Sequence, residues 1–300
     1  MAITNNCTNF LFFAKQQGAY FKNTLTLGRL NLYATKDSIQ KNIDKFQNSS
    51  LQINEVRFPD GYAEPLFKIL GADSVDSLDY SDYEKATIIH DLNNPVPDTL
   101  KNKFDAIVDG GTIEHVFNFP VAIRNCMLAL KKGGHYISIS PANNQMGHGF
   151  YQFSPDLYYR VFSKENGFVI KKMLICPLTN DENNIRLFEV ADPKEVNSRV
   201  MLVNSLPTSL MFIAQKIEEV EIFKNTPQQT DYAISWAASD SIKSGIRPEG
   251  VGFVKNFYRR LLPKPIKNFF RNVYDLFTKE KVQTEELGEI NKLHYKEIKL

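Results

Sequence analysis

The feature that most constrains the fold is a strand, a helix and a second strand in direct succession within residues 103–141. Residues 104–108 form an apolar run that predicts a buried strand, and the turn residues 109–111 follow it. Apolar side chains at helical spacing occupy 121–130, and residues 135–140 predict another buried strand. Two strands joined through a helix favour parallel pairing.

The same alternation precedes this stretch. Strands are expected at 23–28, 74–78 and 86–90, and helices at 36–46 and 62–70. Lys131 to Gly134, two lysines and two glycines, predict the end of the 121–130 helix. Later β-rich runs have short connections between some of them and are expected to finish the sheet antiparallel; they are 167–176, 185–190 and 209–215. The order predicts a Rossmann-like α/β fold, a mostly parallel sheet with helices on both faces.

Ligands of such sheets bind at the carboxyl ends of the strands, so the residues after each expected strand are candidates for a site. The run from Phe104 to Ile107, the turn beginning at Asp109, and Glu114-His115-Val116 resemble class I S-adenosylmethionine-dependent methyltransferases. The resemblance covers roughly 23–216. It implies that S-adenosyl-L-methionine lies across the first strand ends, with its methionine part at the first loop.

The resemblance assigns cofactor contacts to the residues after the second, third and fourth strands. Asp79 matches the acid that binds the ribose hydroxyls, and Asp91, followed by Leu92, matches the acid beside the adenine amino group. Asp109 and Gly110 complete the expected set. A carboxylate accepts two hydroxyl protons well, but an aspartate after a strand also serves as a turn residue or helix cap, and that alternative stays open.

The first loop departs from the family, which usually has an acidic, glycine-rich run there. Here Gly28 is followed by Arg29, with one glycine and no acid. Gly28 is expected to give a sharp turn and close backbone approach to the cofactor, or to be an ordinary turn residue. A dinucleotide-binding dehydrogenase would need three glycines in the G-x-G-x-x-G spacing at this turn, and a phosphate-binding GK[ST] loop is absent from the sequence.

Methyl transfer needs alignment, and a base when the acceptor is a hydroxyl. His115, after the fourth strand, and His148, after the fifth, are the candidate catalytic residues, with helix-start packing as the alternative for His115. The glycine-containing polar loop around His148 has the composition of a substrate lid. Its expected acceptor contacts are Asn144, Tyr151 and Gln152.

A metal ion is not expected, because Asp109, Glu114 and His115 have no diagnostic ligand spacing. The three cysteines lie far apart in the sequence, which favours neither a zinc site nor a disulfide framework and fits a reducing cytoplasm. The sequence contains no run of about 18 apolar residues, so a membrane-spanning helix is not expected.

The expected organisation is a methyltransferase-like domain at 1–225, with its core at 23–216, and an extension at 226–300. Residues 252–281 hold eight basic and two acidic side chains, a net charge of +6. The whole chain has a net charge of +2, so the remaining residues together carry −4. Its apolar stripe predicts two basic amphipathic helices. They are expected to contact a membrane peripherally, or to pack on the domain or a second copy of the chain; nucleic acid is not an expected partner.

Together these features predict an S-adenosyl-L-methionine-dependent methyltransferase acting on a small-molecule or carbohydrate-like acceptor, at oxygen rather than nitrogen. Two alternatives stay open. One is a non-catalytic binding or scaffold protein that keeps the fold without the glycine-rich loop. The other is a different nucleotide-dependent enzyme on the same sheet.

Overall fold

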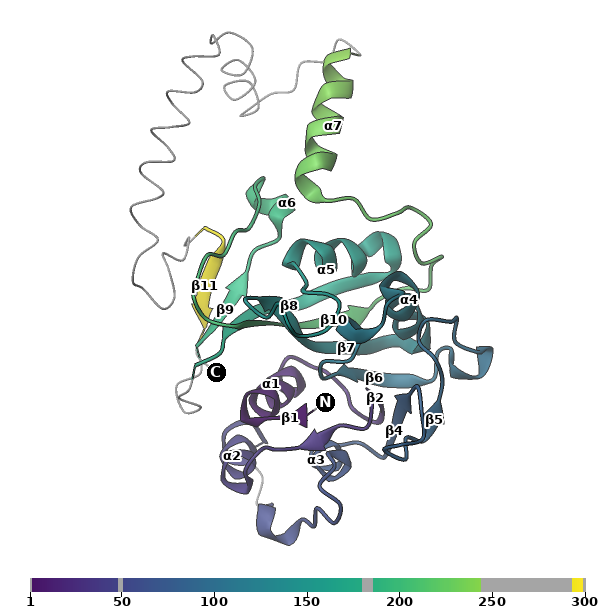
Figure 1. Cartoon of the computed structure of the whole chain (residues 1–300), viewed down its shortest axis with the longest axis vertical. Helices are drawn as coiled ribbons and strands as arrows, with labels where there is room; N and C mark the ends of the chain where they lie inside the picture. The colour runs from purple at the N-terminus through teal and green to yellow at the C-terminus, as the bar shows by residue number, and fades with distance from the viewer. Residues whose placement is uncertain (1, 48–50, 180–185, 244–292, 299–300) are drawn as a thin grey trace.

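A nine-stranded mixed sheet forms the centre of the molecule (Figure 1). The structure is a computed structural model and describes residues 2–47, 51–179, 186–243 and 293–298. The strands follow the order β11-β9-β8-β10-β7-β6-β2-β4-β5. They are β2 (Asn23–Leu27), β4 (Ser74–Asp79), β5 (Ile88–Ile89), β6 (Phe104–Asp109), β7 (Leu130–Asn143), β8 (Phe168–Pro177), β9 (Leu187–Val190), β10 (Thr208–Lys216) and β11 (Tyr295–Ile298). A separate parallel pair is formed by β1 (Ala2–Ile3) and β3 (Asn31–Leu32).

The parallel half of the sheet has the doubly wound arrangement expected from the sequence. The first long strand, β2, pairs in parallel with β4 on one side and β6 on the other. The chain winds outward from β2 to β4 and β5, then crosses back to β6 and β7, so the direction of winding reverses between β2 and β6. Leu27 and Asp109 are partners at the carboxyl ends of these two strands. Open α/β sheets bind their ligands just beyond such a reversal.

The other half is antiparallel, as expected. β10 lies between β7 and β8 and is antiparallel to both, and β9 is antiparallel to β8. β11 continues the sheet from the opposite end of the chain by pairing with β9. The sheet therefore includes residues far beyond the expected core of 23–216.

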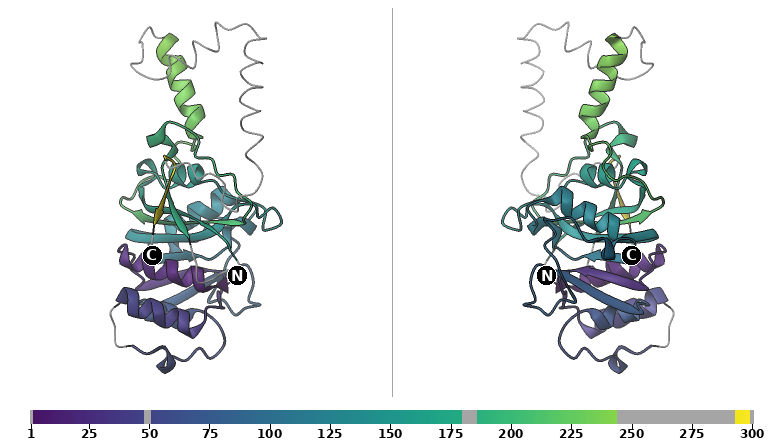
Figure 2. Two further views of the ribbon diagram at one scale, coloured as in Figure 1. Left: turned by 90° about the vertical axis from the view of Figure 1, so that its left-hand side faces the viewer. Right: turned by 90° about the vertical axis from the view of Figure 1, so that its right-hand side faces the viewer.

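Helices cover both faces of the sheet, and each face has its own hydrophobic core (Figures 1 and 2). The helices are α1 (Asn5–Gln16), α2 (Lys36–Asn42), α3 (Glu64–Ile69), α4 (Phe119–Ala129), α5 (Pro155–Val161), α6 (Pro193–Val196) and α7 (Thr230–Lys243). Side chains of α1, α2 and α3 pack on one face, and those of α4 and α5 pack on the other. In β6, Ile107 faces the second core while Ala106 and Val108 face the first. This burial on both sides explains the continuous apolar run at 104–108.

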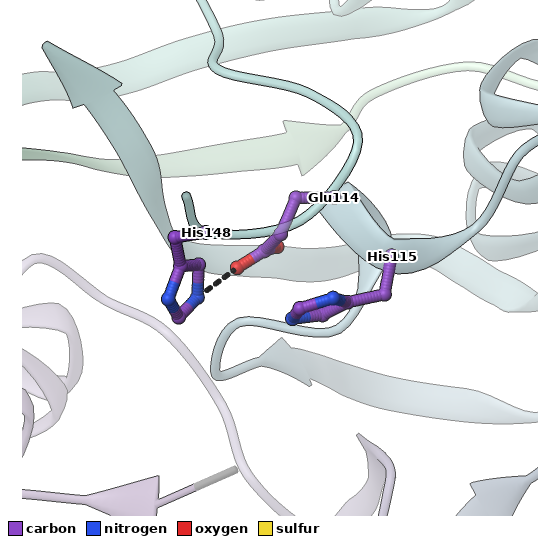
Figure 3. A group of neighbouring side chains, drawn as sticks. All are labelled: Glu114, His115 and His148. Atoms are coloured by element: carbon purple, nitrogen blue, oxygen red, sulfur yellow. Dashed lines mark ion pairs between the residues drawn. The ribbon is translucent and has the colours of Figure 1, made fainter. Parts of the chain in front are cut away.

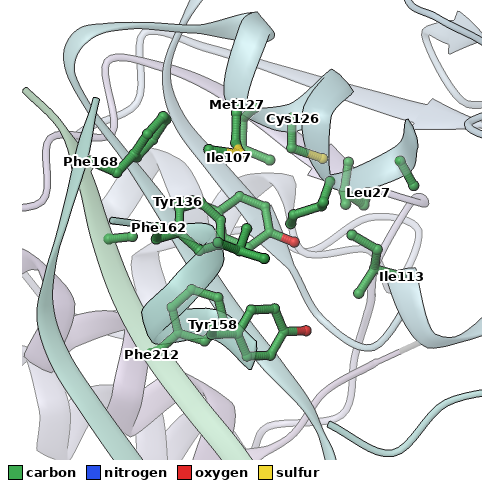
Figure 4. Close-up of a cluster of buried hydrophobic side chains, with 14 of the residues drawn as sticks. Leu27, Ile107, Ile113, Cys126, Met127, Tyr136, Tyr158, Phe162, Phe168 and Phe212 are labelled. Atoms are coloured by element: carbon green, nitrogen blue, oxygen red, sulfur yellow. The ribbon is translucent and has the colours of Figure 1, made fainter. Parts of the chain in front are cut away.

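Aromatic rings fill the core beneath α5 (Figure 4). Tyr158 and Phe162 from this helix and its C-terminal end lie against Tyr136 of β7 and Phe212 of β10, with ring centroids 4.3 to 6.3 Å apart. All four side chains are at most 1% exposed. Their packing fixes the antiparallel strands against the parallel half.

The end of α4 differs from the sequence-based expectation. The helix stops at Ala129, and β7 begins at Leu130, so the glycines of 131–134 lie in the strand and do not cap the helix. Leu130 pairs with Phe104 of β6, and its carbonyl accepts a hydrogen bond of 2.8 Å from the buried ammonium of Lys216. These tertiary contacts extend the backbone before the glycines are reached.

Helix α7 projects from the body beyond α5 (Figure 1). Among the residues that the structure describes, none of the helices combines the length and apolar character needed to cross a bilayer. The predicted basic helices at 252–281 lie outside the described residues.

Candidate active site

The loop after β2 is the first of the loops that meet at the winding reversal. Gly28 follows β2 with a φ of 73°, a left-handed conformation that favours glycine, and its N–H donates to the carbonyl of Leu78 over 2.7 Å. On the other side, the hydroxyl of Thr112 donates to the carbonyl of Leu27 over 2.6 Å. The loops after β2 and β6 are thus joined directly. Gly28 makes the sharp turn that the sequence predicts.

Arg29, which follows Gly28 in the first loop, does not present a free charge. Its guanidinium lies 2.6 Å from carboxylate oxygens of both Asp60 and Glu64 and stacks 3.8 Å above the ring of Tyr62. The two ion pairs raise the pKa of Arg29 against the opposing effect of burial. Two acids therefore surround one base, which makes the first loop compatible with a cationic ligand.

Asp79 ends β4, the strand beside β2, and is partly exposed. One carboxylate oxygen accepts a hydrogen bond of 2.6 Å from the backbone N–H of Tyr80. Among the described residues, the other oxygen has no side-chain donor. One oxygen of Asp79, the residue that the resemblance assigns to the ribose, can therefore still accept hydrogen bonds.

Asp91 is occupied by its own turn. One oxygen accepts from the backbone and side chain of Asn93, at 2.9 and 2.8 Å, and the other accepts from Asn94 at 3.0 Å. The bonds from Asn93 lower the pKa of Asp91. Leu92 is buried and lines a small apolar pocket with Leu78. The alternative stated from sequence, a turn-forming aspartate, describes the side chain of Asp91 in this structure.

Asp109 lies inside the protein. It is 0% exposed, and its oxygens accept four hydrogen bonds. One oxygen binds the N–H groups of Thr112 and Ile113, and the other binds the hydroxyls of Tyr136 and Ser138. Burial raises the pKa of Asp109, while the hydrogen bonds act the other way. The carboxylate shapes the loop after β6 through these bonds. A cofactor contact by Asp109 stays a prediction.

Gly110 and Gly111 complete that loop. A side chain on Gly110 would lie 3.2 Å from Leu30, and Gly111 has a φ of 97°. The backbone approaches closely here. A cofactor contact by Gly110 remains a prediction.

Glu114 is the most unusual carboxylate of the site. Its side chain is 0% exposed, and neither oxygen accepts a hydrogen bond from the residues that the structure describes. Within the same residues its ion-pair partner is His148, whose Nε2 lies 3.3 Å from Oε1. Burial, followed by the nearby charge of Asp109, raises the pKa of Glu114 to about 8. No local pattern signals this burial, because Glu114 stands in a polar turn.

His115 and His148 come together around this carboxylate (Figure 3). Their ring centroids are 5.3 Å apart, although the residues are separated by more than thirty positions in the chain. Both side chains are exposed, and burial together with His148 lowers the pKa of His115. The structure therefore brings the side chains of the two predicted catalytic histidines together, one from the segment after β6 and one from the segment after β7.

The loop that carries His148 is tied down. The N–H groups of Phe150 and Tyr151 donate to the carbonyl of Glu114 over 2.8 and 3.3 Å. The hydroxyl of Tyr151 donates to the carbonyl of Phe117, and the side-chain oxygen of Gln152 accepts from the N–H of Gln145. These bonds form within the protein, so acceptor contacts by Tyr151 and Gln152 remain predictions.

Asn144 sits at the start of the same loop with a φ of 57°. Its side-chain amide donates to oxygens of Asn204 and Leu206. It therefore fastens the loop to the segment before β10. Its contact with an acceptor likewise stays a prediction.

Large, exposed aromatic and apolar side chains follow the strand ends, a feature that the sequence did not single out. They are between 69% and 91% exposed and follow the carboxyl ends of β4, β6 and β7; they are Tyr80, Tyr83, Phe117, Met146 and Phe150. Phe117 and Phe150 meet edge to face, with centroids 6.1 Å apart. Exposed aromatic side chains beyond the strand ends favour recognition of a ligand with apolar faces.

No protein-family model matches the chain, and no curated protein matches its sequence. Solved structures with a similar arrangement include a branched-chain polyamine synthase mutein from Thermus thermophilus, in complex with N4-aminopropylspermidine and 5'-methylthioadenosine. It is 13% identical, with a TM-score of 0.35, and the match covers 72% of this chain and 57% of that one.

Two others are methyltransferases by description. The N-methyltransferase NodS from Bradyrhizobium japonicum, in complex with S-adenosyl-L-homocysteine, is 12% identical over 71% of this chain and 86% of that chain, with a TM-score of 0.37. A structure of the Haloferax volcanii Trm112 activator with a putative methyltransferase matches at 9% identity and a TM-score of 0.37, over 70% of this chain and 91% of that one.

Proposed function

We propose that this chain transfers a methyl group from S-adenosyl-L-methionine to a hydroxyl of a small-molecule or carbohydrate-like acceptor. The observation that carries the proposal is the meeting of His115, His148 and the buried Glu114 beside the winding reversal of a doubly wound sheet. A nucleotide-type ligand binds at such a reversal, and the cluster supplies proton acceptors next to it.

The residues at the first two strand ends fit the methyl donor. Gly28 brings backbone close to the strand ends, and Asp79 keeps one carboxylate oxygen for ribose hydroxyls. The acids around Arg29 offset its charge, which favours a sulfonium cation at the first loop. When bound, S-adenosyl-L-methionine supplies the methyl group on a sulfur that is already a good leaving group.

The chain itself has to orient the acceptor and take its proton. His148 Nε2 is exposed and lies beside Glu114, so it reaches both solvent and a buried carboxylate. Glu114 lies against the imidazole of His148, and the ring of His115 lies 5.3 Å from that of His148, so both rings are available to an acceptor bound beside them. The exposed rings of Phe117 and Phe150 offer apolar faces for an acceptor such as a sugar ring.

The location is part of the proposal. The three cysteines are free and buried, which suits a reducing cytoplasm. The +6 charge of residues 252–281 would draw the enzyme to an anionic membrane surface, at about 1 kcal/mol per basic side chain near the surface. Surface glycans or lipid-linked sugars would then be accessible acceptors.

Calorimetric titration of the full chain with S-adenosyl-L-methionine and S-adenosyl-L-homocysteine tests the donor site. We expect binding of both, and Asp79→Ala should weaken it about 100-fold, because charge-assisted hydrogen bonds are each worth about 1.5–3 kcal/mol. Asp73→Ala is the matched control, since Asp73 is an exposed aspartate at the opposite end of β4. Well-folded protein that shows neither heat nor thermal stabilisation with either ligand would refute the proposal.

Transfer of a radiolabelled methyl group to a panel of hydroxyl acceptors tests the chemistry. His148→Ala should retain donor affinity and lose turnover. If it instead loses donor affinity as fully as Asp79→Ala does, His148 belongs to the donor site. Donor binding without transfer to any acceptor would favour the non-catalytic alternative.

A further inference from the structure

We propose that Glu114, His115 and His148 bind a divalent transition-metal ion of the borderline class, with Zn²⁺ as the reference case. Each residue offers one ligand atom, and these three atoms lie within 4.8 Å of one another. Figure 3 shows the two rings on either side of the carboxylate. The sequence does not predict a metal here, because His148 joins the group only through the fold.

The surroundings of the Glu114 carboxylate support a cation site independently of the distances between the three ligand atoms. Asp109, also 0% exposed, accepts four hydrogen bonds, whereas both oxygens of Glu114 accept none among the described residues. A buried carboxylate without donors costs several kcal/mol. The side chain of His148, 53% exposed and 3.3 Å away, is its one ion-pair partner in the described part of the chain. A bound cation would supply the compensation that the protein's own donors do not.

The backbone holds the three residues together. Phe150 and Tyr151 donate their N–H groups to the carbonyl of Glu114, so the loop from β7 is bonded to the same residue that supplies the carboxylate. Gly149 permits this contact, because a Cβ there would lie 2.8 Å from Cγ of Glu114. The approach of His148 to Glu114 is thus a consequence of backbone structure and not of one side-chain rotamer.

The ligand set selects the ion. Two imidazoles and one carboxylate suit Zn²⁺, Fe²⁺ and similar ions, whereas Mg²⁺ and Ca²⁺ prefer oxygen ligands throughout. Ligands at about 2.0 Å from a tetrahedral ion lie roughly 3.3 Å apart, so the rings would move inward by about 1–1.5 Å. Both histidines are exposed and free to turn by that amount. Their exposure also leaves coordination positions open to solvent or an acceptor.

The binding of a metal ion does not depend on the proposed methyl transfer. A role of the ion in catalysis does rest on that proposed function. An imidazole nitrogen bound to a metal has no lone pair left to act as a base. In the loaded protein, an acceptor hydroxyl coordinated at an open position would lose its proton more easily, because a bound cation lowers the pKa of its ligand. The proton released from that hydroxyl would pass to water.

The experiment is a titration of the full chain, prepared without a histidine tag and stripped by chelator, with Zn²⁺, Co²⁺ or Mg²⁺ alone. We expect one equivalent of Zn²⁺ by calorimetry, visible absorption from the Co²⁺ form, and no comparable binding of Mg²⁺. Glu114→Gln and His148→Ala should each weaken Zn²⁺ at least tenfold, and His115→Ala should change the Co²⁺ spectrum. His294→Ala, at the far edge of the sheet, is the matched control and should bind as the unaltered chain does.

Absence of stoichiometric Zn²⁺ binding by the folded chain would overturn the proposal. So would full retention of affinity and spectrum in Glu114→Gln and His148→Ala. Thermal unfolding of each variant shows whether the protein is folded before titration. Since the titration contains no methyl donor, its failure leaves the methyltransferase proposal standing, and failure of donor binding leaves the metal site standing.

Discussion

Replacing Asp109 tests whether the loop after β6 is organised by a buried carboxylate. Asp109→Ala leaves four buried donors without their acceptor: two backbone N–H groups and the hydroxyls of Tyr136 and Ser138. Each orphaned donor costs about 1–3 kcal/mol, and loss of the buried charge returns part of that sum. We expect the free energy of unfolding to fall by about 3–5 kcal/mol.

Asp109→Asn is the informative comparison. Its amide oxygen can still accept from the N–H groups of Thr112 and Ile113, and its NH₂ can donate to the two hydroxyls, which rotate to accept. The loss should therefore stay below about 1.5 kcal/mol. Urea unfolding of the full chain, followed by circular dichroism, measures both variants. A loss under about 1 kcal/mol for Asp109→Ala, or equal losses in the two variants, would refute the reasoning.

The stability contributed by Asp109 should also depend on pH in a definite direction. Burial raises the pKa of Asp109 above its ordinary value of 3.8, so the folded state holds the proton more tightly than the unfolded state. Stability from such a group is complete below the ordinary pKa and is lost as the pH rises through the folded value. The amide of the Asp109→Asn variant does not titrate. The difference in stability between Asp109→Asn and the unaltered chain should therefore shift in favour of the variant as the pH rises above about 4.

Three further outcomes are expected. Gly149→Ala should cost about 1–2 kcal/mol in urea unfolding, because of its φ of 74° and the contact with Glu114, whereas Gly147→Ala, with open space around it, should be near neutral; equal effects would contradict the close approach. Arg29→Ala should weaken S-adenosyl-L-methionine binding less than tenfold in calorimetry, since its charge is already paired; a larger loss would mean that Arg29 contacts the donor. Replacing the eight bases of 252–281 by glutamine should abolish flotation with anionic vesicles; unchanged flotation would remove the membrane proposal.

Local pattern predicted much of the fold. The apolar run at 104–108 could be predicted because β6 is buried on both faces, and the order of strands and helices required a parallel sheet. The turn at Gly28 also follows from local chemistry, since a positive φ favours glycine. The end of α4 could not be predicted, because Leu130 is held by Phe104 and Lys216, which lie far away in the sequence.

The site was predicted in part for the same reason. The order of strands placed His115 and Asp79 at one edge of the sheet. The meeting of His148 with Glu114 depends on hydrogen bonds from Phe150 and Tyr151, which local pattern does not encode. The internal bonds of Asp109 could not be predicted either, because they depend on the positions of the tyrosine and serine hydroxyls from β7.

The pairing of β11 with β9 changes how the basic segment should be removed. Residues 295–298 form the outermost strand, so the polypeptide between α7 and β11 is joined to the folded body at both ends. A protein that ends at residue 243 would lack the basic residues of 252–281. It would also lack β11, so the backbone N–H and C=O groups of β9 would be uncovered, which favours edge-to-edge aggregation. Loss of solubility in such a protein would then be mistaken for a role of the basic residues. Deletion of 252–281 with 293–298 retained would leave β11 paired with β9. It would therefore separate the effect of the basic residues from the effect of an uncovered strand edge.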